Sequence, residues 1–389
     1  MYNQPPQNYY QQPFPPPVPV RSSSHRRAIK WVLIIIFLLV ACLLGLLTLF
    51  LAGAELTNMN SEQGPIAFLL GLVMATLPVP VYVLLILWID RYEAEPLWLL
   101  GVAFIWGAVF ATFSALIINT LSIVIFSEAF GAVISAPIVE ESAKAFALFT
   151  LYFWKKDEFD GVVDGIVYAG MVALGFAMTE NISYYGRGAL AGHLGGIFIV
   201  RGLMSPFSHP LFTSMTGIGL GWSRQTTNQF VKYAAPVGGF GLAIFLHATW
   251  NGSITFFGGL GFLLTYFLVM VPIFLAAIVV IFFALRREGR VVRENLLCDY
   301  QRGFLTPEEY QSLCSVPGRM GSSFRALRGG GFGIWRDRMQ WNQLASELAF
   351  HRSRVARGIV RSEQEARERE AAYLQMMHEL GQRLRQIRT

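Results

Sequence analysis

Long apolar segments between Trp31 and Leu285 constrain the fold of this 389-residue chain more than any other feature. A membrane-spanning helix needs about 20 predominantly apolar residues. The chain is 54% hydrophobic and only 14% charged, whereas a soluble domain is about 25% charged. Eight candidate spans lie at residues 31–53, 64–89, 97–125, 129–154, 161–183, 200–222, 233–256 and 259–285. We therefore predict an all-α fold, a polytopic membrane bundle of about eight transmembrane helices with a C-terminal soluble helical tail.

Composition divides the chain into three parts. Residues 1–30 form a Pro/Gln-rich N-terminal tail, which we predict to be disordered because this composition cannot build a packed core. Residues 31–285 form the predicted transmembrane domain. Residues 286–389 form a tail with 19 arginines, no lysine and 12 acidic residues. On a membrane protein this excess of arginine predicts contact with anionic lipid headgroups, and we expect no nucleic-acid partner.

The arginine-rich tail also carries local signals for helices. Thr306-Pro307-Glu308-Glu309 is a capping box with proline at the first helical position, so a short helix is predicted to start there. Residues 328–333 form a glycine-rich joint, and the pattern is helical again from about residue 340. Residues 363–388 alternate acidic and basic side chains, as a solvated helix does.

Basic residues near the ends of the spans indicate the orientation. Cytoplasmic loops of membrane proteins carry an excess of lysine and arginine. With eight spans, the main basic groups all fall on one side of the membrane: His25 to Lys30, Arg91, Lys155-Lys156, Arg224 with Lys232, and Arg286-Arg287. We therefore predict an integral protein of the cell membrane with both termini in the cytoplasm.

Ionisable and amide side chains inside the apolar segments are the main functional signal. A charged side chain at the bilayer centre costs about 2.5–3.5 kcal/mol on translocon-insertion scales, and it usually faces an interior or a cavity. The polar residues in question are Glu140, Glu141, Lys144, Glu180, His209, His247 and Asn251. One such residue is often a packing group, but a set of this size predicts a functional site.

The depth of these residues can be predicted from the helical rise of about 1.5 Å per residue. Glu140, His209 and His247 then lie roughly 20 Å from the cytoplasmic ends of three different spans. Glu180 lies roughly 30 Å from Asp160 by the same rise, which is too far outward for the common depth. Glu140, His209 and His247 are therefore predicted to meet, whereas Glu180 is predicted to lie at a different depth.

Spacing within the helices adds a second constraint, because residues three or four positions apart share a face. Lys144 can pair with Glu140 and with Glu141, and His247 shares a face with Asn251. Glu140 and Glu141 diverge by about 100°. One of them is predicted to face the site while Lys144 or a neighbouring span holds the other. Gly217 and Gly221, spaced as GxxxG, are predicted to allow close helix packing.

The set permits peptide hydrolysis, which needs an activated water and donors for the oxyanion. A carboxylate in an apolar cavity can serve as the base, and we predict Glu140 or Glu141 in that role. Histidine and carboxylate side chains also suit a divalent metal such as zinc, and the candidate ligands are Glu140, Glu180, His209 and His247. His247 and Asn251 are predicted to donate to the oxyanion. These residues are compatible with two mechanisms, in which either a metal ion or a carboxylate activates the water molecule.

Signatures of other proteolytic sites are missing from the sequence. It contains no HExxH, no GxGD and no GxSxG motif. Its three cysteines form neither a disulfide framework nor a CxxC metal site. Zincin, aspartyl and serine-elbow sites are therefore not predicted.

Four motifs in order resemble the PrsW family, which is similar to the type II CAAX prenyl endopeptidases. They are Glu140-Glu141-Ser142-Ala143-Lys144, the run from Asp164-Gly165 through Phe176 to Glu180-Asn181, His209 with Phe212-Thr213, and His247-Ala248-Thr249-Trp250-Asn251. The resemblance covers roughly residues 65–285. It implies an intramembrane endopeptidase of eight-helix type, whose founding member cleaves a membrane-anchored anti-sigma factor. By position it carries over Glu140, Glu141, Glu180, His209, His247 and Asn251 as site residues.

One difference from the CAAX enzymes narrows the class of substrate that we predict. The CAAX enzymes have histidine where this chain has Glu180, which makes processing of prenylated peptides a poor fit. We predict an intramembrane endopeptidase that cleaves single-pass membrane proteins. Two alternatives from other classes are a proton- or ion-coupled transporter, because buried Glu and His also form proton relays, and a catalytically inactive membrane scaffold.

Overall fold

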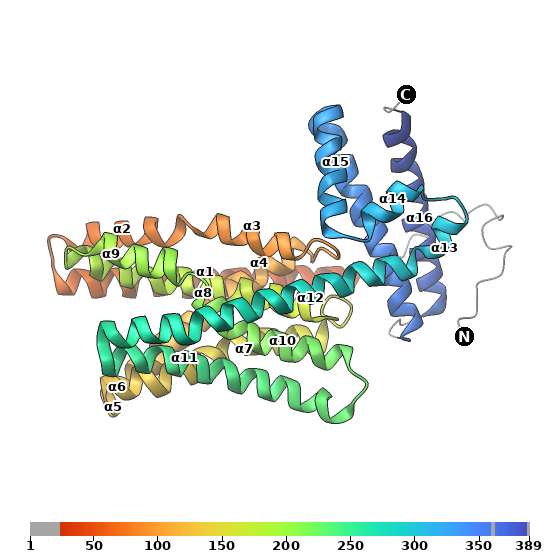
Figure 1. The fold of residues 1–389 in the computed structure, drawn as a ribbon. Helices are drawn as coiled ribbons and strands as arrows, with labels where there is room; N and C mark the ends of the chain where they lie inside the picture. The colour runs from red at the N-terminus through yellow and green to blue at the C-terminus, as the bar shows by residue number, and fades with distance from the viewer. Residues whose placement is uncertain (1–23, 359–361, 387–389) are drawn as a thin grey trace. The chain divides into compact units, whose positions relative to one another are not determined.

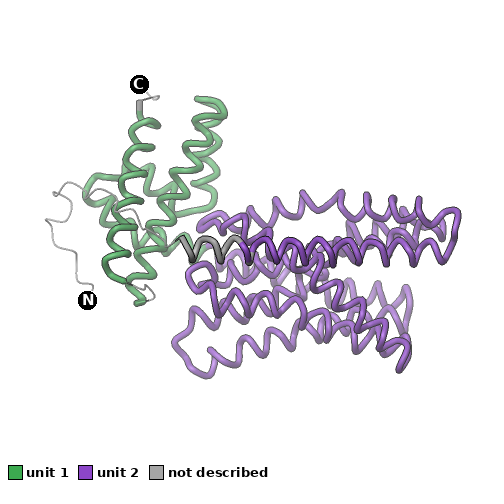
Figure 2. Tube along the Cα trace, turned by 180° about the vertical axis from the view of Figure 1, so that it is seen from behind, with its two compact units in different colours: residues 1–31, 286–389 green, residues 32–285 purple. Residues whose placement is uncertain are grey.

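The computed structural model describes residues 24–358 and 362–386, and it is helical throughout this part of the chain (Figure 1). The predicted all-α fold is confirmed. Two compact units are present: residues 32–285, and residues 286–389 together with residues 1–31 (Figure 2). The prediction for the proline-rich N-terminal tail lies mostly outside the described residues.

The α-helices of the larger unit follow one another along the chain with short connections. They are α1 (Ser24–Met59), α2 (Gly64–Thr76), α3 (Val79–Ile89), α4 (Leu97–Ile105), α5 (Thr112–Ile125), α6 (Glu128–Phe130), α7 (Ala136–Trp154), α8 (Val162–Leu190), α9 (Leu194–Phe198), α10 (Ser208–Gln225), α11 (Gln229–Thr265) and α12 (Val271–Asn295). Four π-helical segments interrupt them, at Trp106–Ala111, Gly131–Ser135, Ile199–Met204 and Tyr266–Met270. α1 and α12 each continue into the smaller unit.

Five helical stretches are long and apolar enough to cross a membrane. They are Ile34–Met59, Gly64–Ile89, Leu97–Ile125, Val162–Leu190 and Gln229–Asn295. The last breaks at Gly258, where φ is 56°, so it contains two of the predicted spans. α7 and α10 fill the remaining predicted segments, but α7 has three charged residues and α10 many small polar ones. The chain is therefore an integral membrane protein with several spans, and the count of eight stays a prediction.

α8 is the central helix of the larger unit. In its most apolar stretch 83% of the residues are buried, against 11% for α1, and it packs against α2, α4 and α10. Glycines bring the α8 and α10 backbones together: a Cβ on Gly217 would meet the backbone oxygen of Gly165, and one on Gly221 that of Gly161. The predicted packing role of Gly217 and Gly221 is confirmed.

A buried acidic group lies at the end of the larger unit that carries Lys155. Asp90 and Glu95 follow α3 in a short loop, and both are almost fully buried. Asp90 Oδ2 accepts a hydrogen bond of 2.7 Å from the Glu95 backbone, and the Tyr168 hydroxyl donates to Glu95. Burial, together with the nearby charge of Asp164, raises the pKa of both carboxyl groups well above the usual range.

Glu95→Gln is expected to flatten the pH dependence of stability. A raised carboxyl pKa means that the folded state binds the proton more tightly than the unfolded state does. This contribution to stability is therefore complete below the unfolded pKa and is lost as pH rises toward the folded pKa. Glutamine keeps an oxygen that can accept the Tyr168 hydrogen bond but does not ionise.

Thermal unfolding in detergent at pH 5 and pH 8 measures this effect. The wild type should lose more of its midpoint temperature between the two pH values than Glu95→Gln does. Glu62→Gln, at an exposed loop residue, is the matched control and should behave as the wild type. Equal slopes for the wild type and Glu95→Gln would contradict the prediction.

The smaller unit contains four further helices, α13 (Leu297–Gln301), α14 (Pro307–Leu313), α15 (Val316–Ala356) and α16 (Glu363–Gln386). The predicted capping box is confirmed, because Thr306 and Glu309 cap each other's backbone at the start of α14. The glycine-rich joint is confirmed as well, since α15 breaks at Gly331 with φ at 73°. Arg352 joins α15 to Asp299 and Glu370 by ion pairs.

Candidate active site

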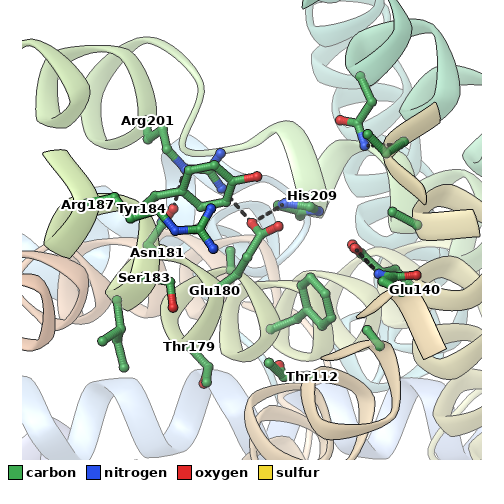
Figure 3. Close-up of a pocket in the computed structure, with 18 of the residues that line it drawn as sticks. Thr112, Glu140, Thr179, Glu180, Asn181, Ser183, Tyr184, Arg187, Arg201 and His209 are labelled. Carbon is green, nitrogen blue, oxygen red and sulfur yellow. Dashed lines mark hydrogen bonds and ion pairs between the residues drawn. The ribbon is translucent and has the colours of Figure 1, made fainter. Parts of the chain in front are cut away.

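Four helices place the predicted polar residues beside one cavity (Figure 3). α7 contributes Glu140, and α8 contributes Glu180. His209 is the second residue of α10, and His247 lies midway along α11. Glu140, His209 and His247 are buried, although each of their helices exposes apolar side chains elsewhere. The polar face of each helix therefore points inward, as intramembrane charges require.

Glu140, His209 and His247 form the centre of the site. One ligand atom from each lies within 4.8 Å of the other two. These are the three residues that the helical rise placed at a common depth, so their predicted convergence is confirmed. Two imidazoles and a carboxylate at this separation can hold a metal ion or a water molecule.

Lys144 binds both glutamates of its helix. Its Nζ lies 2.9 Å from Glu141 Oε1 and 3.6 Å from Glu140 Oε2, as the spacing predicts. It also lies 3.2 Å from His209 Nδ1 and 3.9 Å from the centre of the Phe176 ring. Lys144 is fully buried, so its charge is balanced inside the protein rather than by water.

The two adjacent glutamates have different surroundings. Glu141 is fully buried and accepts hydrogen bonds from Lys144, from Thr213 Oγ1 at 2.8 Å and from His247 Nδ1 at 3.2 Å. Glu140 lines the cavity, and its Oε2 has no hydrogen-bond partner among the described residues. The prediction that one glutamate faces the site while the other is held in place is confirmed, with Glu140 as the facing residue.

His247 is oriented by both glutamates. Its Nδ1 contacts Glu141, which leaves Nε2 directed at Glu140 Oε2 at 3.8 Å. A histidine that donates one ring N–H to a carboxylate presents its other nitrogen as a ligand. The Glu141–His247 pair therefore fixes the tautomer that the centre needs.

Glu180 lies beside the three-residue centre, not within it. Its Oε2 is 3.1 Å from His209 Nε2 and 2.5 Å from Arg201 Nη2. The predicted mismatch in depth has a local explanation: α10 begins only at Ser208, so His209 stands at the outer end of its helix. The side chain of Glu180 can then reach His209. Of the four predicted metal ligands, Glu180 alone is outside the converging group.

Asn251 lies one turn beyond His247 and lines the cavity, as their spacing predicts. Its Nδ2 donates to the backbone oxygen of Ala132 at 2.9 Å. An amide nitrogen carries two hydrogens, so a second donor is left. Its role toward an oxyanion stays a prediction.

The cavity has a volume of about 950 Å³ and extends from the centre toward the end of the bundle that carries Glu55. There Arg187 forms an ion pair with Glu55 at 2.5 Å. α1 forms part of the wall through Thr48, Ala52 and Glu55. The centre can therefore be reached from the end opposite Lys155.

The contacts of Arg201 and Asn119 are among those that were not predicted from the sequence. Arg201 Nε lies 2.5 Å from Asn181 Oδ1, and the guanidinium lies 3.6 Å from the centre of the Tyr184 ring (Figure 3). Asn119 Nδ2 donates to Glu140 Oε1 at 3.3 Å. Arg201 was visible in the sequence as a charge within an apolar segment, which is a signal for a buried partner. Asn119 gave no comparable signal.

Comparison with known proteins identifies the family. Residues 95–277 match the model of the PrsW family intramembrane metalloproteases. Protease PrsW of Geobacillus kaustophilus is 33% identical over 164 residues, which cover 42% of this chain and 69% of that protein. Protease PrsW of Oceanobacillus iheyensis is 34% identical over 182 residues, covering 45% and 79%. The chain belongs to the PrsW family.

Membership of the PrsW family confirms the resemblance read from the motifs and makes the chain a membrane-embedded protease. Protease PrsW of Bacillus subtilis matches over a shorter stretch, 38% identical over 91 residues that cover 23% of this chain and 39% of that protein. No solved structure matches the chain. A protease family favours hydrolysis over the transporter alternative.

The family's description as metalloproteases agrees with the donor set. Glu140 Oε2 is buried, has no hydrogen-bond partner among the described residues and lies 3.6 Å from Lys144 Nζ, so a metal ion bound there would share this carboxylate with Lys144. His247 is held by Glu141 in the orientation of a ligand. Two histidines and one glutamate are the protein ligands of a well-known class of catalytic zinc sites. The residues present therefore fit a metal such as zinc.

Proposed function

We propose that this PrsW-family protein is an endopeptidase that hydrolyses peptide bonds of single-pass membrane proteins, with its catalytic centre at Glu140, His209 and His247. The convergence of these three buried side chains from three helices carries the proposal. Membrane-anchored anti-sigma factors are one substrate class that fits.

Glu140, His209 and His247 would hold a zinc ion. When bound, the ion polarises the scissile carbonyl and acidifies a water molecule. Glu141 does not line the cavity, and it acts through His247 and Lys144, which it positions. This assignment replaces the predicted choice of Glu140 or Glu141 as the base, because Glu140 is then needed as a ligand and Glu141 does not line the cavity.

Glu180, which is ion-paired with Arg201, is the carboxylate beside the centre that we assign to move the proton. It lines the same cavity, next to His209, and is not required as a ligand. Its carboxylate takes the proton of the attacking water, whose oxygen bonds to the carbonyl carbon. The same proton then passes to the leaving amine as the C–N bond breaks. Asn251 donates its free N–H to the developing oxyanion.

The substrate would approach beside α1 on the outer side. α1 packs through few close contacts, and most of its surface faces outward. The cavity reaches the end that carries Glu55, which is extracellular if both termini are cytoplasmic, as the positive charges predict. Cleavage is therefore expected in the outer part of the cell membrane.

Metal analysis tests the centre directly. The purified protein is expected to contain about one zinc per chain, and His247→Ala should lose most of it, because ligand removal typically lowers metal affinity by more than the 10–100-fold seen for outer-shell partners. Chelator treatment should stop cleavage of a reporter single-pass protein in proteoliposomes, and added zinc should restore it. Full cleavage by a metal-free protein would reject the zinc assignment but not the protease.

A further inference from the structure

The two arms of α15 form a hairpin that is polar inside and apolar outside near its tip. The arms run antiparallel around Gly331, because residues near 320 in the first arm contact residues near 345 in the second. Asn342 Nδ2 donates to Ser323 Oγ at 3.3 Å, and Arg319 donates to the Asn342 backbone at 2.8 Å. Arg319 also donates to Ser346 Oγ. All four residues are buried.

Large apolar side chains are exposed on both arms and at the turn of this hairpin. Met320, Phe324 and Leu327 follow one another at helical spacing along the first arm and are 48%, 58% and 41% exposed. Phe332 stands at the turn and is 70% exposed, and Met339 on the second arm is 45% exposed. A hairpin that faces only water rarely exposes this many large apolar side chains.

The apolar tip is flanked by positive charge. Arg325 and Arg328 are exposed, and neither forms an ion pair with another described residue. Arg336 is also exposed, and its guanidinium lies 3.8 Å from Asp337 Oδ1. Aromatic and aliphatic side chains bordered by arginine are the composition of an interfacial membrane anchor.

We propose that the hairpin tip, defined by Met320, Phe324, Leu327, Phe332 and Met339, inserts into an anionic lipid leaflet with Arg325 and Arg328 at the headgroups. The tail follows an apolar membrane helix directly, which confines it to the neighbourhood of the bilayer. Pairing of two tips from separate copies would bring like arginine charges together, whereas acidic headgroups complement them. The inference does not depend on the protease activity.

Photo-crosslinking in the full-length protein tests the proposal. Benzoylphenylalanine replaces Phe332 or, as the matched control, exposed Glu368 on α16. The protein is reconstituted in vesicles of phosphatidylcholine alone or mixed with phosphatidylglycerol, and adducts are identified by mass spectrometry. We expect lipid adducts at position 332 in the anionic vesicles and none at position 368.

Charge variants give the size of the effect. Arg325→Gln and Arg328→Gln should each lower the ratio of inserted to free tip about fivefold, as expected for one arginine near an anionic surface. Adducts between two copies at position 332 would overturn the lipid assignment in favour of self-association. Equal lipid adducts at 332 and 368 would overturn the role of the tip.

Discussion

Glu140→Gln is expected to lower cleavage of a membrane-protein reporter by about 10²-fold or more, the size of effect usual for the loss of a catalytic group. Glu140 faces the cavity with an oxygen that has no hydrogen-bond partner among the described residues. Glutamine has nearly the same shape, so the bundle should stay folded. An amide is a much weaker metal ligand than a carboxylate, and the bound zinc should be lost as well.

Glu180→Gln tests the second role, that of the proton carrier, alongside Glu140→Gln. It should lose activity to a similar degree but retain zinc, because Glu180 lies outside the converging group. Cleavage and metal content measured on both variants separate a ligand from a proton carrier. Near wild-type cleavage by Glu140→Gln would remove the proposed centre. Loss of zinc in Glu180→Gln alone would exchange the two roles.

Lys144→Met is expected to have the largest effect on folding stability. Lys144 and Glu141 are fully buried and 2.9 Å apart. Removing one partner of a buried ion pair leaves an uncompensated charge and typically costs about 3–5 kcal/mol. The variant should also lose activity, because Lys144 contacts Glu140 and His209.

Unfolding in detergent, followed by tryptophan fluorescence, measures the loss of stability. Lys155→Met, at the exposed end of α7, is the control and should change the free energy of unfolding by less than about 1 kcal/mol, as surface ion groups usually do. The double variant Lys144→Met/Glu141→Gln should recover part of the stability, since neither charge is then left alone. A loss no larger than that of Lys155→Met would show that water reaches this pair.

Sequence patterns predicted much of the fold because the bilayer simplifies the problem. Each apolar segment had to be helical, and the segments at 64–89 and 97–125 agree closely with helical stretches in the structure. The boundary predicted between residues 256 and 259 coincides with the break at Gly258, although the chain stays apolar on both sides of it through residues 229–295. The hydropathy of α7 and α10 is reduced because these helices carry polar side chains of the site.

The centre itself was predicted in part. The helical rise placed Glu140, His209 and His247 together because each is fixed by a regular helix that ends at the same side. Glu180 was predicted to lie farther outward than these three residues, and it lies outside their group; its contact with His209 was not predicted, because it depends on the start of α10 at Ser208. The contact of Lys144 with His209 depends on packing between α7 and α10, which one sequence does not encode in its spacing.

The size of the cavity limits what can be cut. A helix about 10 Å wide rises 5.4 Å per turn, so a space of about 950 Å³ accommodates roughly two turns of a substrate. The peptide carbonyls of an intact helix are hydrogen-bonded and sterically covered, so a membrane helix of the proposed substrate class would have to unwind before water can attack. Susceptibility should then depend on how readily a membrane helix frays near its outer end. Glycine or proline in the substrate would matter more than any particular side chain at the cleaved bond.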